Sequence, residues 1–182
     1  MIRVPVEVMW VVSAILVEAA IIDGLKYRVP NWLTAHFAIG GLVFAYWTGG
    51  LPALAWSAQG LLLGLGLLLP VNIIGAMGAG DVKLLAAVGA WVGASTIFGA
   101  FATTAIVGGF LGVGIIFWSG EGLRHLQATQ VVVQEVLTIR DPGELARRAA
   151  ERKPTSKRLP YAIPIAVGSI GYFTWMGMLG KM

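Results

Sequence analysis

Residues 97–118 read IFGAFATTAIVGGFLGVGIIFW, a run without a single charged residue. A helix that crosses a bilayer needs about 20 consecutive apolar residues, and runs of this kind fill most of the chain. We expect spans at about 4–22, 33–48, 52–69, 81–94, 97–118 and 160–179. The second and fourth are short for a bilayer, and the boundary near Ser95 is the hardest to place. The sequence therefore predicts an all-α, polytopic membrane helix bundle of about six transmembrane helices.

The composition excludes several classes of protein. Hydrophobic residues make up 57% of the chain and charged residues 12%, whereas soluble domains carry about 25% charged residues. The net charge is +4, but the basic residues lie between the apolar runs and not on one surface, which argues against a nucleic-acid partner. With no cysteine and only two histidines, His36 and His125, we expect no disulfide, no metal site and no cofactor.

The basic residues also predict an orientation. Cytoplasmic loops of membrane proteins carry an excess of Lys and Arg. Here the segments 23–32, 70–83 and 119–159 hold Lys26, Arg28, Lys83, Arg124, Arg140, Arg147, Arg148, Arg152, Lys153, Lys157 and Arg158. Only Arg3 and Lys181 fall on the other side. We therefore expect both termini to be non-cytoplasmic, the run from Val4 to Ile22 to be a retained first helix, and residues 1–182 to form one domain.

The segment from 119 to 159 is the only extended polar stretch. Within it, Asp141-Pro142-Gly143-Glu144 is typical of a helix start, with Asp at the N-cap, Pro at N1 and Glu at N3. We expect a short basic helix from there to about Lys153, ending before Pro154. This helix is either part of a linker that touches solvent and lipid headgroups or a surface that helps to hold a substrate. The residues alone leave both readings open.

Glycine recurs at helix spacing along three of the apolar runs. The pairs are Gly60 with Gly64, Gly89 with Gly93, and Gly108 with Gly112. Small residues four apart allow two helices to pack closely. In a chain with 25 glycines, such spacing also arises by chance.

Acids inside a membrane are costly and mark functional sites. The apolar runs and their ends contain Glu7, Glu18, Asp23 and Asp81. We expect Glu7 and Glu18 to be structural, although Glu18 is near enough along the helix to act on Asp23 as a like charge. Asp23 closes the first apolar run, and Asp81 opens another after Gly78-Ala79-Gly80. The predicted topology brings Asp23 and Asp81 to the same, cytoplasmic side.

Two carboxyl groups at one depth can hydrolyse a peptide bond without a metal. One accepts a proton from the attacking water while the other donates a proton or hydrogen bond to the peptide carbonyl. Gly78 and Gly80 lack a Cβ, so backbone can approach closely or take a positive φ there. The alternative is a tight turn with Asp81 as an ordinary N-cap. Helix dipoles favour the charge on Asp81, which begins a helix, and the proton on Asp23, which ends one.

At these residues the chain resembles the prepilin peptidases, the GxGD-type membrane aspartyl proteases that process type IV pilins. Asp23 followed by Arg28-Val29-Pro30-Asn31 is similar to the family's first-aspartate stretch, with Val where Ile is usual. Gly78-Ala79-Gly80-Asp81-Val82-Lys83-Leu84 closely matches its second-aspartate motif. Leu159-Pro160-Tyr161-Ala162-Ile163-Pro164-Ile165-Ala166 is similar to the stretch that opens its last helix, with Ala where Gly is usual. The resemblance spans nearly the whole chain.

The resemblance implies that Asp23 and Asp81 are the catalytic pair of an aspartic endopeptidase. Its substrate would be a type IV prepilin or pseudopilin, cut after a glycine between a short basic leader and a hydrophobic helix. The motif residues implied to lie near this substrate are Gly78, Gly80, Lys83, Arg28, Pro30, Asn31, Pro160 and Tyr161. Lys83 would bind backbone carbonyls or hold Asp81 ionised, or it is simply a lysine that follows the positive-inside rule.

The longer relatives in this family carry an N-terminal cytoplasmic insertion with paired cysteines and also N-methylate the mature pilin. In this chain Asp23 lies close to the first residue, and cysteine is absent. The chain therefore looks like the short, peptidase-only type of the tight-adherence (Flp) pilus systems, without methyltransferase activity. The resemblance implies a multi-pass protein in the bacterial inner membrane, surrounded by lipid, with its active site facing the cytoplasm. The sequence does not indicate an oligomeric state.

Three other functions stay open on the residues alone. A transporter or channel subunit could bind a proton or cation with the same acid pair, which would then lie nearer the bilayer midplane. A preflagellin or presenilin-like peptidase shares the GxGD logic but cuts other substrates. In a structural subunit of a secretion machine, the two acids would be dispensable.

Overall fold

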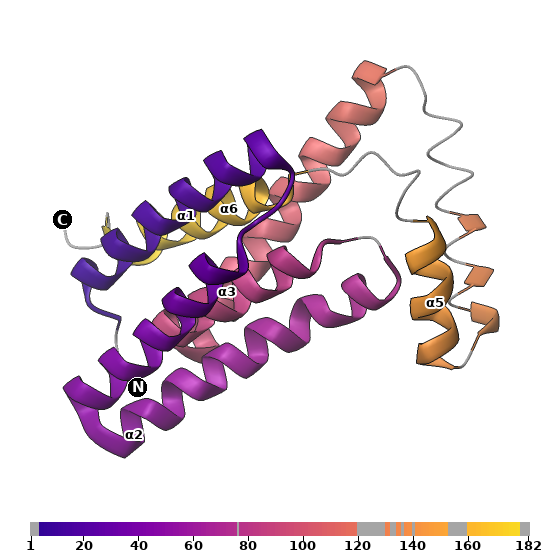
Figure 1. Cartoon of the computed structure of the whole chain (residues 1–182). Coiled ribbons are helices and arrows are strands. Elements are labelled where there is room, and N and C mark those ends of the chain that lie inside the picture. The colour runs from indigo at the N-terminus through magenta and orange to yellow at the C-terminus, as the bar shows by residue number, and fades with distance from the viewer. Residues whose placement is uncertain are drawn as a thin grey trace.

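The computed structural model describes residues 4–75, 77–119, 130–131, 134–135, 137–139, 141–152 and 160–178. The regular elements in these ranges are all helical, which confirms the predicted all-α class. In chain order they are α1 (Val6–Lys26), α2 (Asn31–Ile73), α3 (Ala79–Ser119), α5 (Pro142–Arg152), α6 (Ala162–Phe173) and the π-helical turn η1 (Thr174–Met178). Figure 1 shows them as one bundle, with α5 at its edge beside the turn between α2 and α3.

α2 and α3 are each broken by glycine. An unbroken helix of the 43 residues of α2 would be about 65 Å long, roughly twice the hydrocarbon core of a bilayer. Instead the backbone leaves helical geometry at Gly49 and at Gly50, where φ is +62°, and in α3 at Gly93, where φ is +73°. A positive φ suits glycine because it has no Cβ. Figure 1 shows α2 folding back on itself.

These breaks fall close to the predicted boundaries between spans. The glycines of α2 lie between the expected spans 33–48 and 52–69, and Gly93 lies just before Ser95. By length and apolar composition, Val6–Lys26, Asn31–Ile73 and Ala79–Gly114 can cross a membrane, and Ala162–Gly177 is a shorter apolar helix. The chain is therefore a membrane helix bundle. How many segments cross the bilayer, and in which direction, stays a prediction.

Glycine also sets the packing between α2 and α3. A Cβ at Gly60 would run into the backbone of Gly89 and Gly93, and one at Gly64 would lie 2.6 Å from the carbonyl oxygen of Leu85. The helices therefore touch backbone to backbone, as the first two glycine pairs predict. The third pair differs, because nothing lies within 4 Å of a Cβ at Gly112.

α6 is antiparallel to α1 and packs between α1 and α3 (Figure 1). At one end of the pair, the amide of Ala162 in α6 donates a hydrogen bond to the carboxyl group of Asp23 in α1. At the other end, a Cβ at Gly177 would lie 3.0 Å from the Met9 side chain. On its α3 side, α6 accepts a 2.8 Å hydrogen bond from the Thr103 hydroxyl at the carbonyl of Gly168. The last apolar helix is thus fixed against the first.

The helix predicted within the polar segment forms as α5. Asp141 precedes it, and the Asp141 carboxylate accepts a 2.9 Å hydrogen bond from the Gly143 amide. Glu144 in the first turn accepts bonds from Arg147 at 2.8 Å and from Arg148 at 3.0 Å. The predicted start is therefore confirmed. Several residues named above lie outside the described ranges: Arg3, Arg124, His125, Arg140, Lys153, Pro154, Lys157, Arg158, Leu159 and Lys181.

Candidate active site

The two predicted aspartates meet at one end of the bundle. Asp23 lies in the last turn of α1 and is 4% exposed, and Asp81 lies in the first turn of α3 and is 6% exposed. They are close enough for the charge of Asp23 to act directly on Asp81. Two buried carboxyl groups from separate helices therefore share one environment, which is the arrangement that acid–base chemistry by an aspartate pair requires.

Asp23 is held by the start of α6. The amide N–H of Ala162, the first residue of α6, donates a 3.1 Å hydrogen bond to Oδ2 of Asp23. The first amides of any helix lack a partner within the helix, and α6 has no side-chain cap of its own. Asp23 therefore serves as the acceptor for an amide that begins a helix 139 positions later in the chain.

This contact changes the argument from helix dipoles. The predicted division of charge depends on Asp23 lying only at the end of α1. In the structure Asp23 also faces the N-terminal end of α6, and Asp81 lies in the first turn of α3. Helix N-termini favour negative charge, so both acids experience the same kind of stabilisation. The predicted division, with the charge on Asp81 and the proton on Asp23, no longer follows from the dipoles.

The glycines before Asp81 are needed because neighbouring atoms lie close to them, and not because their backbone has a positive φ. A Cβ at Gly78 would lie 2.9 Å from Oδ2 of Asp81, and Gly78 forms a backbone hydrogen bond with this carboxyl group. A Cβ at Gly80 would lie 3.2 Å from Cβ of Val29. Among the described residues, the glycines with a positive φ are Gly50, Gly75 and Gly93. Gly78 thus leaves room for the Asp81 side chain, and Gly80 for the chain that follows Asp23.

The first and second motifs are joined by a side-chain contact. Nζ of Lys83 donates a 3.0 Å hydrogen bond to Oδ1 of Asn31, and both side chains are exposed. Asn31 is the first residue of α2, and Pro30 is the N-cap before it. Arg28 is also exposed in this turn. Lys83 therefore ties the start of α3, with Asp81, to the start of α2.

The third motif lies on the same cluster. Tyr161 is half-buried, and a Cβ at Gly108 would lie 2.6 Å from its hydroxyl oxygen. The charge of Asp81 acts on Tyr161. Pro160 precedes it, and its carbonyl oxygen accepts a 3.2 Å hydrogen bond from the amide of Ile163. All three sequence motifs, although far apart in the chain, thus come together around Asp23 and Asp81.

The remaining candidates do not join this cluster. Glu7 and Glu18 are exposed on α1. His36 is exposed on α2, where its Nδ1 lies 2.7 Å from the carbonyl oxygen of Trp32. In the part of the chain that the structure describes, no three His, Asp or Glu side chains gather as a metal site would need. The absence of a metal or cofactor in the working protein stays a prediction.

Comparison with known proteins identifies the family. The model described as the type IV leader peptidase family matches residues 10–113, which is more than half of the chain and includes Asp23 and Asp81. The chain belongs to the type IV leader peptidase family. Within the chain, the family match covers the first two motifs, whereas Pro160 and Tyr161 lie beyond it. Their place beside the acids of this leader peptidase family protein is therefore a finding of the structure.

The curated relatives of this leader peptidase family protein are longer. The chain is 35% identical over 109 residues to the prepilin leader peptidase/N-methyltransferase of Aeromonas hydrophila. It is 33% identical over 108 residues to the protein of the same name from Aeromonas salmonicida. Each alignment covers 56% of this chain and 37% of the relative, so the chain matches little more than a third of their length. No solved structure matches the chain.

Proposed function

We propose that the chain is a membrane aspartic endopeptidase that removes the short basic leader from type IV prepilins or pseudopilins, with Asp23 and Asp81 as its catalytic pair. The observation that carries this proposal is the meeting of two buried carboxyl groups from α1 and α3 at one end of the bundle. Membership of the type IV leader peptidase family supports it, as do the names of the relatives.

The chemistry needs only the acid pair and water. Two like charges at close range disfavour ionisation of both groups, so the resting pair holds one proton between them. The ionised carboxylate takes a proton from water as the water oxygen attacks the peptide carbonyl carbon. The protonated carboxyl donates to the carbonyl oxygen. As the intermediate collapses, the C–N bond breaks and the amine leaves with a proton from the pair.

The surrounding motif residues act as positioning groups in this proposal. Gly78 and the amide of Ala162 orient one carboxyl group each. The Lys83–Asn31 bond fixes the start of α3 against the start of α2. Lys83 is exposed and bonded to Asn31, which favours this role over direct stabilisation of an ionised Asp81. We expect the substrate to approach along the exposed side that carries Lys83 and Arg28, next to Pro30, Gly80, Pro160 and Tyr161.

We further propose that the active site faces the cytoplasm of a bacterial inner membrane. The described basic residues Lys26, Arg28 and Lys83 lie at the same end of the bundle as the acids, which supports this orientation through the positive-inside rule. The substrate class is then an Flp-like prepilin, the whole chain works as one unit, and the product carries no added methyl group. The absence of cysteine supports the last point.

A transporter function is less well supported. It would place the acid pair near the bilayer midplane. Asp23 lies three residues before the end of α1, and Asp81 is the third residue of α3. Both acids therefore lie near helix ends and away from the middle of a span.

The proposed function is tested by co-expressing the chain with a type IV prepilin and following the mass of the pilin N-terminus. The expected result is loss of the leader, without methylation of the new N-terminus, in cells that contain the chain and not in cells with an empty vector. A precursor that keeps its leader would contradict the proposal. Ion flux through liposomes that contain the chain, without leader release, would favour the transporter.

A further inference from the structure

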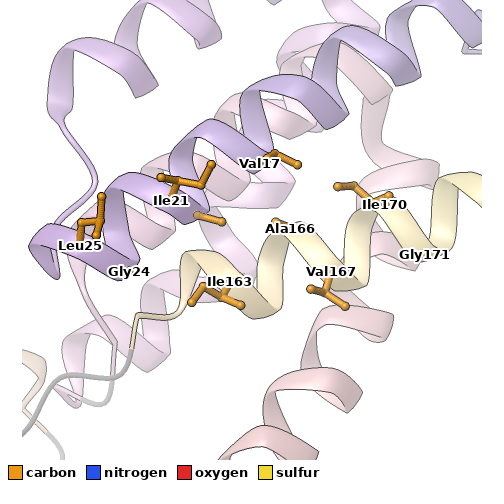
Figure 2. A pocket seen from close by; sticks show the side chains of 10 residues that line it. Val17, Ile21, Gly24, Leu25, Ile163, Ala166, Val167, Ile170 and Gly171 are labelled. Carbon is orange, nitrogen blue, oxygen red and sulfur yellow. The ribbon is translucent and has the colours of Figure 1, made fainter.

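An apolar groove runs between α1 and α6 on the outside of the bundle. Its volume is about 750 Å³. Figure 2 shows Val17 and Ile21 along α1 and Ile163 and Val167 along α6, with Gly24 and Gly171 among the other lining residues. Every lining residue is apolar. The groove is therefore suited to a hydrocarbon surface, either a peptide helix or a lipid chain.

One end of this groove lies beside the catalytic pair. Gly24 follows Asp23 in the chain, and Ile163 follows Ala162, whose amide bonds to Asp23. A Cβ at Gly24 would lie 3.8 Å from Cδ1 of Ile163, which is an ordinary van der Waals contact, so α1 and α6 touch at this end. Asp23 itself does not line the groove. From this end the groove extends along α1 to Val17, about 10 Å or two helical turns away.

We propose that this groove binds the apolar segment of the substrate that directly follows the scissile bond. This inference rests on the proposed function. When the scissile bond lies at the acids, near the end of α1, the hydrophobic helix that follows must continue into the bilayer beside them. The groove begins next to Asp23 and runs in that direction, and its lining contains no polar side chain that such a helix would leave unpaired.

The shape of the groove favours a helix over loosely held lipid. In a bilayer, helices associate through close van der Waals packing, because lipid tails are as apolar as the side chains. Gly171 provides a small surface at which another backbone can come close. Nothing lies within 4 Å of a Cβ at Gly171, so the far end is open to an incoming segment.

The first test fills the groove without disturbing the bundle. Gly171→Leu adds a side chain where the structure has open space, and Gly66→Leu does the same on α2, where nothing lies within 4 Å of the new Cβ. Two substrates are compared: the full precursor and a short peptide that spans the cleavage site but lacks the apolar segment. For Gly171→Leu, we expect kcat/KM to fall about tenfold with the precursor and to stay unchanged with the peptide. Gly66→Leu should match the wild type with both substrates.

A second test detects the contact itself. The chain has no cysteine, so a single introduced thiol is unique. Val167→Cys in the groove is compared with Val43→Cys on α2, because these valines are 53% and 55% exposed. Each is placed in an Asp81→Asn background and mixed, in the presence of a mild thiol oxidant, with a precursor that carries one cysteine in its apolar segment. We expect a disulfide cross-link with Val167→Cys and none with Val43→Cys.

The outcomes separate this inference from the proposed function. Cleavage of the precursor by the wild type, together with normal cleavage by Gly171→Leu and no cross-link at Val167→Cys, would overturn the groove alone and leave lipid as its occupant. Equal cross-linking at both cysteines would also overturn it. Failure of the wild type to cleave either substrate would overturn the proposed function, and the groove proposal with it. Normal peptide cleavage by Gly171→Leu shows that this variant is folded.

Discussion

The protein handles its acidic side chains in two opposite ways. Glu144 on α5 forms salt bridges with Arg147 and Arg148 of the same helix, at the exposed edge of the bundle. Asp23 and Asp81 are buried at the end of the bundle, and within the described ranges neither forms an ion pair with Lys or Arg. Their hydrogen bonds come from backbone amides at the starts of α6 and α3, and the charge of Asp23 acts on Asp81.

In the proposed function, this difference separates an acid that supports a helix from two acids that take part in catalysis. Ion pairs three or four residues apart stabilise an exposed helix by only a few tenths of a kcal/mol. Burying two carboxyl groups without a neighbouring cation costs free energy, and such burial is typical of functional sites. Disturbing the buried pair should therefore affect activity far more than stability, whereas disturbing Glu144 should affect only α5.

Among changes that keep both aspartates, the largest effect is expected when the Asp81 carboxyl is displaced. Gly78→Ala places a Cβ 2.9 Å from Oδ2 of Asp81, so the carboxyl must turn away. Turning the end of a side chain costs little stability, but a misplaced catalytic group slows the reaction. We expect the rate of leader cleavage to fall about tenfold or more, with little change in thermal stability. Gly66→Ala, which has open space, is the matched control, and an equal loss of rate in both would contradict this reading.

A smaller effect is expected at the Lys83–Asn31 bond. Lys83→Met and Asn31→Ala each remove one partner of a 3.0 Å hydrogen bond, which is worth about 1 kcal/mol at most in an exposed setting. In a double-mutant cycle on unfolding free energy, the two changes should be less than additive. Full additivity would mean that the contact does not couple α2 to α3.

The smallest effect is expected at α5. Hydrogen bonds from Arg147 and Arg148 lower the pKa of Glu144 to about 2 from its ordinary 4.5. A carboxyl whose pKa is lower in the folded state stabilises that state above its ordinary pKa and loses the contribution as the pH falls through the lowered value. The protection factors of the α5 amides in hydrogen exchange, which are corrected for the pH dependence of the intrinsic exchange rate, should therefore fall between pH 4.5 and about 2. Glu144→Gln should remove this dependence and leave leader cleavage unchanged. A cleavage defect in Glu144→Gln would contradict the prediction that Glu144 stabilises α5 and has no part in leader cleavage.

Much of this arrangement could be predicted from the sequence, because its determinants are local. Apolar run length predicts the helices and places span boundaries close to the breaks at Gly49, Gly50 and Gly93, and Asp141 with Pro142 marks the start of α5. The two acids are recognisable because charge at the end of an apolar run is costly. Each of these signals is contained in a few neighbouring residues.

The contacts that could not be predicted join residues far apart in the chain. The amide of Ala162 reaches Asp23, and Lys83 reaches Asn31. A sequence signal for the first does exist: α6 begins without a capping side chain of its own, so its first amides need an acceptor from elsewhere. The groove between α1 and α6 leaves no such signal, because its apolar residues look the same as those that face lipid.

The central claim is that Asp23 and Asp81 act as one catalytic unit, although 58 positions separate them in the chain. The most direct measurement is the single-turnover rate of leader release from a purified prepilin by the wild type, Asp23→Asn, Asp81→Asn and the double variant, at matched thermal stability. Loss of a general acid or base costs about 10²- to 10⁴-fold, and groups that act as a unit are not additive. We predict that each single variant loses at least about 10²-fold and that the double variant is no slower than the slower single one. Leader release at the wild-type rate by either single variant would contradict the claim.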